Sequence, residues 1–295
     1  MSSVDLAVQA FRELKPEDFK VLSTIEANMS RFRYVPGNIV SSSSGLPGKD
    51  VEFRLGRLNG FGLIFRWVGS YNGYVLSTAG YDCLAINALV KANVIEALGK
   101  SLGVGKESDV YGVLTPHGEK AAAKFHRLGR TSFRKTRRLR TYVGERRHAP
   151  WLLQSRLAAE KEFEGLKMVH RYGVAVPKPI SQNRHVLVMG MIEGNELTEF
   201  AEIPQPEKVL EEILFNIRKA YLDSGIVHGD LSEFNIILKP DNHILIIDWP
   251  QYVRKDHASA ENLLKRDVRN VLHFFDRKFK VGIELDDALR FVKGG

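Results

Sequence analysis

A polar segment between apolar runs is the feature that most constrains this chain. Residues 228–235 read His-Gly-Asp-Leu-Ser-Glu-Phe-Asn, and Asp248 follows thirteen residues after Asn235. Apolar runs at 236–238 and 244–247 flank a stretch that contains Pro, Asp and Asn, which is typical of a β-hairpin. A hairpin centred between residues 241 and 242 places Asn235 directly opposite Asp248. Because facing residues have Cβ atoms roughly 5 Å apart, we predict that this amide and this carboxylate can reach one hard cation.

The spacing of these polar residues matches the active site of protein kinases. Asp230 and Asn235 are five residues apart, as in the H-R-D-x-x-x-x-N catalytic loop, and Asp248 stands where the D-F-G motif supplies a carboxylate. We therefore predict that Asp230 is catalytic and that Asn235 and Asp248 bind Mg²⁺, which prefers oxygen ligands, with Mn²⁺ as the alternative ion. The bland alternative is a surface hairpin with polar residues at its ends.

A glycine-rich stretch precedes two further strand-like runs. It leads into apolar residues 110–114, and a Thr-Pro-His-Gly turn then leads to residues 121–125. Strand, turn and strand over phosphates is the protein kinase arrangement, whereas a Walker P-loop leads from a strand into a helix. Lys124 stands in Ala-Ala-Ala-Lys where kinases have V-A-I-K, although by itself it could be an exposed strand lysine. The predicted ATP contacts here are Gly103, Gly105, Lys106, Glu107, Ser108, Val110 and Lys124.

The sequence also offers an acidic partner for Lys124. Residues 152–171 have a helical apolar face, and Glu162 lies within it, whereas Glu160 and Glu164 point away. An acid on a buried face needs a buried cation, so we predict an ion pair between Glu162 and Lys124.

An apolar run at 186–192 opens into a glycine-containing linker. In a kinase this segment is the hinge. We predict that backbone groups near Gly190 and Ile192 bind adenine and that Met189 guards the pocket. Taken alone, the run is merely a buried strand.

Residues 1–95 are predicted to form a winged-helix domain. Helical patterns at 14–28 and from Gly48 precede two strand-like runs, and the Asn72-Gly73 pair between these runs is a strong hairpin signal. Thr78 is placed to cap a further helix. Helices followed by a hairpin make a winged helix, in which Arg54 and Arg57 could face phosphates. Protein docking is the alternative, so DNA binding by this domain stays open.

The net charge of +8 is concentrated in one segment. Residues 126–148 hold eight Arg and one Lys against one Glu, so the rest of the chain nets to zero. The planar fork of Arg suits phosphate, and we predict that this segment contacts RNA backbone or a ribosomal surface. A solvated loop is the alternative.

Cysteine usage and hydropathy bear on location. A single cysteine, Cys83, excludes an internal disulfide and fits a reducing compartment. The sequence has no apolar stretch of the length that a membrane-spanning helix requires. We predict a cytoplasmic protein with no membrane partner.

Together these residues resemble the RIO family of atypical serine/threonine protein kinases, and the winged helix resembles its second branch. The resemblance rests on Gly-Lys-Glu-Ser at 105–108, Lys-Phe-His at 124–126, Thr-Ser-Phe at 131–133, the segments at 228–232 and 247–251, and Arg-Asp-Val-Arg-Asn at 266–270. It implies an α+β fold, in which the winged-helix domain (1–95) precedes a reduced two-lobed kinase domain (96–295) with an N-lobe at 96–189, a hinge at 190–194 and a C-lobe at 195–295.

The resemblance also implies a function. Family members carry out ATP-dependent autophosphorylation or ATP hydrolysis in small ribosomal subunit maturation, so it implies the pre-ribosomal small subunit or its rRNA as a partner. Carried over by position, Asp230 is the catalytic Asp, Asn235 and Asp248 hold the metal, and Asp248 can itself accept phosphate. Lys124 and the loop of Ser108 contact the nucleotide.

The sequence differs from ordinary protein kinases at several motifs, and these differences argue against a regulated signalling kinase. His228-Gly229-Asp230 lacks the Arg that answers an activation-loop phosphate, and Pro250 replaces the flexible Gly of D-F-G. Only 47 residues follow Asp248, too few for a full peptide-binding lobe. A small-molecule kinase of the aminoglycoside or choline type shares the H-G-D-x-x-x-x-N and I-D-W motifs and is the alternative enzyme. A non-enzymatic binding protein with a degenerate kinase fold is the third alternative.

Overall fold

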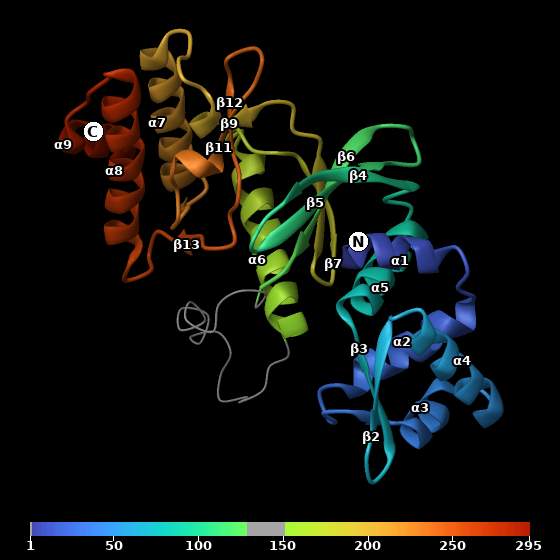
Figure 1. Cartoon of the computed structure of the whole chain (residues 1–295). Helices are drawn as coiled ribbons and strands as arrows, with labels where there is room; N and C mark the ends of the chain where they lie inside the picture. Colours follow the sequence, from blue (N-terminus) through green and yellow to red (C-terminus); the bar gives the residue numbers. More distant parts are fainter. Residues whose placement is uncertain (1, 129–150) are drawn as a thin grey trace.

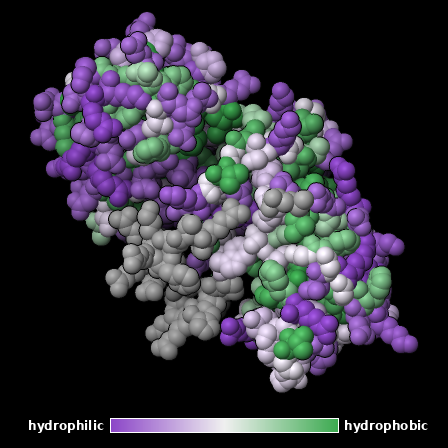
Figure 2. All heavy atoms as spheres, in the orientation of Figure 1, coloured by the Kyte–Doolittle hydropathy of each residue, from purple (hydrophilic) through white to green (hydrophobic). Residues whose placement is uncertain are grey.

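The computed structural model describes residues 2–128 and 151–295, which form two hydrophobic cores. One core lies in the N-terminal half and the other in the C-terminal half, and the long helix α6 (Trp151–Arg171) runs between them (Figure 1). Most of the predicted basic segment, from residue 129 onward, lies outside the described residues. On the face shown in Figure 2, hydrophobic atoms are visible over the N-terminal part, and the C-terminal part is mostly hydrophilic.

The N-terminal part is a winged helix, as predicted. Its sheet is antiparallel, with the strand order β1-β3-β2. Its elements are α1 (Ser3–Phe11), α2 (Pro16–Asn28), β1 (Val35–Pro36), α3 (Gly37–Ser44), α4 (Gly48–Gly60), β2 (Ile64–Val68), β3 (Asn72–Leu76) and α5 (Thr78–Lys91). Two of these helices, α1 and α3, were not predicted. Helix α1 is short and begins with a capping box between Ser2 and Asp5, whereas α3 ends in four serines, which are poor helix formers.

Two local details of the winged helix differ from prediction. Asn72 and Gly73 do not form the hairpin turn but begin β3, opposite Val68 and Trp67. Gly73 is needed for packing instead, because a Cβ there would lie 2.6 Å from the Cβ of Tyr34. The cap of α5 is Ser77, whose Oγ accepts the N–H of Gly80 at 3.1 Å, and not Thr78.

The two arginines that could face phosphates are paired with an aspartate of α2. Arg54 is 8% exposed and donates to Asp18 Oδ1 at 3.0 Å, and Arg57 donates to Asp18 Oδ2 at 2.8 Å. Asp18 itself is fully buried. This carboxylate therefore joins α2 to α4 through both guanidinium groups, and the pairing favours a structural role for them over the suggested phosphate contacts.

The N-lobe is built on a five-stranded antiparallel sheet with the order β4-β5-β6-β8-β7. Its strands are β4 (Ala97–Val104), β5 (Ser108–Leu114), β6 (Lys120–His126), β7 (Pro179–Asn183) and β8 (Val186–Gly190). Side chains alternate between the faces of a strand. Tyr111, Val113, Ala123 and Phe125 join the core of the winged helix, whereas Leu187 joins the core that contains α6. The winged helix therefore covers one face of this sheet, and α6 lies on the other.

The C-lobe is mainly helical with three small strand pairings. Its elements are β9 (Asn195–Glu196), α7 (Pro206–Leu222), β10 (Ile226–Val227), β11 (Ile236–Leu238), β12 (Ile244–Ile246), β13 (Val253–Arg254), α8 (Ala260–Phe279) and α9 (Leu285–Lys293), with 3₁₀ turns at Leu197–Glu199 and Glu233–Asn235. The three helices α7, α8 and α9 pack side by side (Figure 1). The strands β9, β11 and β12 form one small sheet, and β10 pairs with β13. Over the described residues, no helix is both long and apolar enough to cross a membrane.

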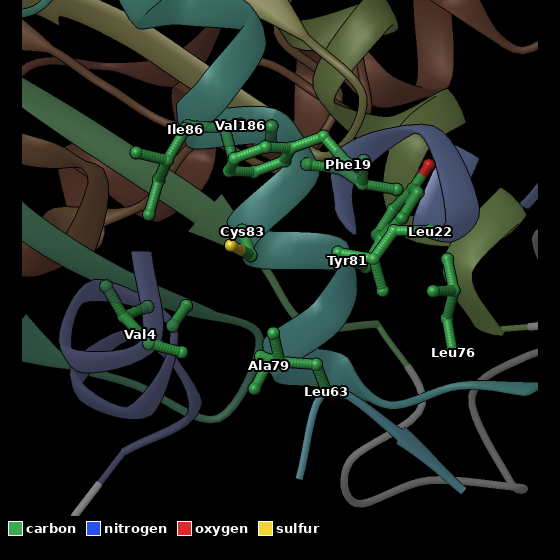
Figure 3. Close-up of a cluster of buried hydrophobic side chains, with 14 of the residues drawn as sticks. Val4, Phe19, Leu22, Leu63, Leu76, Ala79, Tyr81, Cys83, Ile86 and Val186 are labelled. Carbon is green, nitrogen blue, oxygen red and sulfur yellow. The ribbon is translucent and has the colours of Figure 1, made fainter. Parts of the chain in front are cut away.

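A single core unites the winged helix with the N-lobe sheet. It includes Val4 and Leu22 from the first two helices together with Val113 and Val186 from the sheet. Figure 3 shows Val186 of β8 beside the side chains of α5. The division at residues 95 and 96 and the limits of the two lobes therefore stay predictions about the chain, since burial does not separate the first two parts.

Cys83 provides a test of this core. Its side chain is fully buried on α5 (Figure 3), and burial raises the pKa of the thiol to about 12. The thiolate is the reactive form of cysteine. We therefore expect an alkylating reagent at pH 8 to label the native protein about 100-fold more slowly than the urea-unfolded protein. The measurement is the labelling rate by mass spectrometry. Rapid labelling of native protein would contradict the packing.

Candidate active site

The ammonium group of Lys124 lies at the centre of the candidate site. Its Nζ donates to both carboxylate oxygens of Glu162 on α6, at 2.7 and 2.9 Å, and to Oδ1 of Asp248 at 2.7 Å. Lys124 is 8% exposed and Glu162 is 1% exposed, whereas the side chain of Asp248 is 44% exposed. The ion pair predicted from the periodicity of α6 is confirmed, and it also reaches the residue predicted to bind metal.

Charge pairing decides the ionisation of this cluster. Burial alone would lower the pKa of Lys124, but the carboxylates of Asp248 and Glu162 outweigh burial and raise that pKa above its ordinary value. Burial alone would raise the pKa of Glu162, but Lys124 and the neighbouring His126 outweigh it and lower that pKa to about 2. Both groups are therefore charged at neutral pH.

Two further residues support the cluster, and neither was given a role from the sequence, although His126 belongs to the Lys-Phe-His motif. Nε2 of His126 lies 2.8 Å from Oε2 of Glu162. Gly165 of α6 faces the segment after Asp248, and a Cβ there would lie 2.8 Å from the ring of Tyr252. A glycine at this position lets α6 approach that segment closely. The sequence held one signal for His126, since it is two residues after Lys124 and so shares its face of β6.

His228 connects the catalytic loop to the residue before Asp248. Its Nδ1 accepts the backbone N–H of Asp230 at 3.3 Å, and its Nε2 lies 2.9 Å from the carbonyl oxygen of Ile247. Because Nδ1 is an acceptor here, Nε2 carries the proton and donates it to that carbonyl. The imidazole thus ties the segments that carry Asp230 and Asp248 to each other.

The backbone conformation and close packing at position 229, directly before Asp230, require a glycine. Gly229 has φ +79°, and a Cβ there would lie 2.6 Å from the carbonyl oxygen of Gln251. Its N–H donates to the buried Asp267 at 2.7 Å, and its carbonyl accepts from Arg266 of α8. Arg266 Nη2 also lies 3.8 Å from Oδ1 of Asp230. Arg266 and Asp267 belong to the quoted Arg-Asp-Val-Arg-Asn motif, although their roles were not predicted.

The register of the β11–β12 hairpin corrects the predicted pairing. Ile236 faces Ile246 and Leu238 faces Ile244, so the turn is centred on Asp241 and not between Asp241 and Asn242. The N–H of Lys239 donates to His243 at 2.8 Å to close this turn. Asn235 therefore pairs with Ile247, whose N–H donates to its carbonyl at 2.9 Å. The predicted direct opposition of Asn235 and Asp248 is wrong by one residue.

A backbone irregularity follows at Asp248. Its φ is +68°, a left-handed value that residues other than glycine rarely adopt. Such strain concentrates at functional sites. The side chain of Asp248 reaches Lys124, as described above. Asn235 donates from Nδ2 to the carbonyl of Asp230 at 2.8 Å, which leaves its amide oxygen as the group able to bind a cation.

The glycine-rich stretch lies at the edge of the same site. It is mostly the end of β4 and the turn into β5, in which the N–H of Gly105 donates to the carbonyl of Ser108 at 2.8 Å. Lys106 and Glu107 are exposed in this turn, as is Gly103 in β4. Ser108 and Val110 alternate with the buried Asp109 and pair with residues 126 and 124 of β6. The structure thus brings Ser108 and Val110 close to Lys124.

The predicted hinge follows β8 directly. Met189 is 6% exposed and pairs with Ala122, and Gly190 is the last residue of the strand. The N–H of Gly190 donates to the carbonyl of Lys178 at 2.8 Å, so that N–H is not free for a ligand. Ile192 lies in the following linker, and Met191 approaches the Gly112 position of β5.

A cavity of about 500 Å³ opens at the Lys124 end of the site. It runs between α6 and the chain after Asp248, and its lining includes Ser108, Lys124, Asp248 and Tyr252. Lys161 also lines it, with Nζ 5.2 Å from the ring centre of Tyr252. The cavity therefore adjoins the end of the site where phosphates are predicted and not the hinge.

The Lys124–Glu162 pair predicts a pH-dependent loss of stability. Because the pKa of Glu162 falls from an ordinary 4.5 to about 2, its contribution is complete above pH 4.5 and is lost as the pH falls towards 2. Glu162→Gln should lower the free energy of unfolding by about 3 kcal/mol at pH 7, and the difference from wild type should shrink at pH 3. Urea unfolding at both pH values measures it. The exposed Glu164→Gln on the same helix is the control, and an equal effect of both changes would contradict the prediction.

Comparisons with known proteins agree with this geometry. The RIO domain family matches residues 109–288, and the Rio2 N-terminal domain family matches residues 11–92. The RIO-type serine/threonine-protein kinase Rio2 of Methanocaldococcus jannaschii is 45% identical over 274 residues, which cover 90% of this chain and 99% of that protein. The serine/threonine-protein kinase rio2 of Schizosaccharomyces pombe is 37% identical over 278 residues, which cover 94% and 80%.

A solved structure is similar over the same length. The Rio2 kinase of Chaetomium thermophilum, crystallised as an ADP/Mg²⁺-phosphoaspartate complex, superposes with a TM-score of 0.82 at 31% identity, covering 97% of this chain and 89% of that one. A RIO domain over more than half of the chain, a Rio2 N-terminal domain before it and these identities agree with one another. The chain belongs to the RIO family of serine/threonine protein kinases, with the N-terminal domain of the Rio2 branch.

Proposed function

We propose that this protein binds ATP with a divalent cation and transfers the γ-phosphoryl group, either to a serine or threonine, including its own, or to water. The observation that carries the proposal is the position of Lys124, which contacts both Glu162 and Asp248 at 2.7 Å. A kinase needs this lysine fixed by a helix carboxylate and close to the metal-binding aspartate. The same three groups would have no reason to converge in a purely structural hairpin.

The nucleotide contacts follow from the faces of the N-lobe sheet. We assign the α- and β-phosphates to Lys124 and the turn that ends at Ser108. The turn includes Gly105, Lys106 and Glu107, Gly103 precedes it at the end of β4, and Val110 lies beside the base or ribose. We assign adenine to the linker at Ile192 and to the remaining backbone groups at Gly190, with Met189 behind them. The ADP and Mg²⁺ named for the Chaetomium thermophilum kinase support this assignment.

The donor atoms fit a magnesium ion. Asp248 offers a partly exposed carboxylate, and Asn235 has its amide nitrogen engaged and its oxygen remaining. Hard cations such as Mg²⁺ and Mn²⁺ take oxygen ligands of this kind. When bound, the ion would neutralise phosphate charge. Lys124 holds Asp248 in place beforehand, and His228 holds the backbone just before it.

Asp230 is proposed as the group that orients the attacking hydroxyl or water. Its side chain is 62% exposed, so an acceptor can reach it. The loop that carries it is fixed by His228, which accepts the backbone N–H of Asp230, and by Asp267, which accepts the N–H of Gly229. Asp248 is proposed as a second acceptor, because the related Chaetomium thermophilum structure is a phosphoaspartate complex.

Substitution of the two aspartates separates their roles. Asp230→Ala should reduce autophosphorylation on the order of 10²–10⁴-fold and leave ATP affinity nearly unchanged, because Asp230 does not contact Lys124. Asp248→Ala should instead weaken the dependence on Mg²⁺. Labelled phosphate incorporation and a Mg²⁺ titration measure these effects. Asp276→Ala, an exposed carboxylate on α8, is the control. Unchanged incorporation in Asp230→Ala would remove that residue from the mechanism.

The small ribosomal subunit precursor is proposed as the partner, through the basic segment at 126–148. The support is its sequence charge, because residues 129–150 lie outside the described part of the structure. One of its arginines does not take part: Arg127 is 2% exposed and paired with Asp82 and Asp109. The phosphate contacts are therefore proposed for the arginines after it. A cytoplasmic location is also proposed, because the single cysteine fits a reducing compartment.

Salt dependence tests the basic segment. RNA affinity should fall steeply as salt rises, because each neutralised phosphate releases counterions. Changing Arg137, Arg138 and Arg140 to Gln should weaken binding and reduce the slope of log K against log salt by roughly 2. Fluorescence anisotropy with a labelled rRNA fragment measures both. The control changes three basic residues exposed on α8 to Gln, namely Lys265, Arg269 and Arg277. A slope that is flat, or equally reduced in the control, would refute the assignment.

Kinase and ATPase action are distinguished by one experiment. The protein is incubated with γ-labelled ATP, with and without small ribosomal subunits, and phosphoprotein and free phosphate are followed separately. Label that stays on the protein after hydroxylamine treatment, which cleaves an acyl phosphate on Asp248, indicates transfer to serine or threonine. Free phosphate released when subunits are present indicates a switch driven by hydrolysis. The small-molecule kinase alternative is disfavoured, because the family match extends through both domains.

A further inference from the structure

Arg127 forms a buried charge bridge between the winged helix and the N-lobe. Its Nη1 and Nη2 donate to the two carboxylate oxygens of Asp82 on α5, at 2.7 and 2.9 Å, and its Nε donates to Asp109 of β5 at 2.9 Å. The exposed fraction is 2% for Arg127 and zero for both aspartates. His185, also fully buried, places Nε2 2.7 Å from Asp82 Oδ1. These groups are removed from water between the two parts of the chain.

The same arginine holds the predicted nucleotide loop through its backbone. Its N–H donates to the carbonyl of Glu107 at 2.7 Å. Glu107 and Asp109 are the two neighbours of Ser108, which faces the site. Arg127 therefore forms a hydrogen bond with each neighbour of Ser108. Arg127 directly follows β6 and is three residues after Lys124. Arg127 thus reaches the winged helix and Asp109 of β5 with its side chain and the loop with its backbone N–H, directly after the strand that carries Lys124.

Arg127 and Asp82, both buried, keep each other charged and in a fixed orientation. Burial alone would raise the pKa of Asp82, but the charge of Arg127 and the hydrogen bond from His185 outweigh it and hold that pKa below its ordinary value. A fork of two parallel bonds from Arg to a carboxylate fixes direction as well as distance. Removing one partner would leave the other charge buried and unpaired, so neither group can easily turn away.

We propose that the winged helix is a positioning part of the nucleotide site: Asp82 orients Arg127, and Arg127 holds the loop at Glu107 and Asp109 in the shape that binds phosphates. The proposal rests on the ATP site put forward above. It makes Asp82 and Arg127 positioning residues that act through the loop. Coupling between sites is reciprocal, so a partner that binds the winged helix and shifts α5 would change ATP affinity, and ATP would change the affinity for that partner.

A matched pair of variants tests the bridge. Asp82→Asn keeps the shape of the side chain and removes its charge. Glu26→Gln does the same to another ion pair between the winged helix and the N-lobe, in which Arg184 donates to both oxygens of Glu26 at 2.8 and 2.7 Å. Arg184 lies in the β7–β8 turn, and its partners do not include the nucleotide loop. Both variants weaken the contact between the two parts, but only the first should disturb the loop.

The expected result is a selective loss of ATP binding. KM for ATP should rise on the order of tenfold in Asp82→Asn, within the usual range for coupling between sites, while kcat at saturating ATP changes by less than about twofold. Amide hydrogen exchange should speed up at Gly105, whose N–H closes the loop. Glu26→Gln should show neither change. If Asp82→Asn does not fold, Arg127→Lys, which keeps the charge and loses the fork, is tested in the same way.

Three outcomes overturn the proposal. The first is a KM for ATP that stays at the wild-type value in a folded Asp82→Asn or Arg127→Lys variant. The second is exchange of the Gly105 amide at the wild-type rate, and the third is an equal rise of KM in Glu26→Gln. In the last case the bridge is only structural. Failure of the wild-type protein to bind ATP at all is a different result, since it removes the proposed function itself and not the bridge.

Discussion

The buried ammonium group of Lys124 is the point on which the site depends. A lysine that is 8% exposed needs carboxylates around it, and these come from two elements that are distant along the chain. Glu162 brings α6 onto the sheet, and Asp248 brings in the end of the β11–β12 hairpin. The glycine at position 165 lets α6 pack closely against the segment after Asp248. One charge thus sets the distance between sheet, helix and C-lobe.

The two faces of the N-lobe sheet have different roles: one carries residues of the candidate active site, and the other packs against the winged helix. Its cleft face carries Lys124 and His126, and its other face carries Phe125 and Tyr111 in the core shared with the winged helix. Arg127 continues the second face, where two buried aspartates hold it. Because strands alternate their side chains, residues that neighbour each other in sequence serve opposite faces. The winged helix can therefore influence the nucleotide loop without contacting the nucleotide.

Local patterns in the sequence were sufficient where a single element decides the outcome. The apolar face of residues 152–171 identified Glu162 as the inward acid, since helical periodicity by itself fixes that direction. Kinase-like spacing identified Lys124, Asp230, Asn235 and Asp248, and the structure brings Lys124 against Asp248 and Asn235 against the Asp230 backbone. The hairpin register was wrong by one residue, because it depends on a turn closed by Lys239 and His243 that the letters alone do not specify.

The sequence by itself determined the fold class, the family and the residues that carry the proposed chemistry, because their types and spacing are local properties of the chain. Only the tertiary structure decided which charges are available. Arg54 and Arg127 look like phosphate ligands in the sequence. In the structure Arg54 is paired with Asp18, 36 residues away, and Arg127 with Asp82, 45 residues away. The sequence does not show whether an arginine is buried or exposed. Removing its charge from water costs free energy, and that cost is offset only when the fold brings a carboxylate partner from elsewhere in the chain.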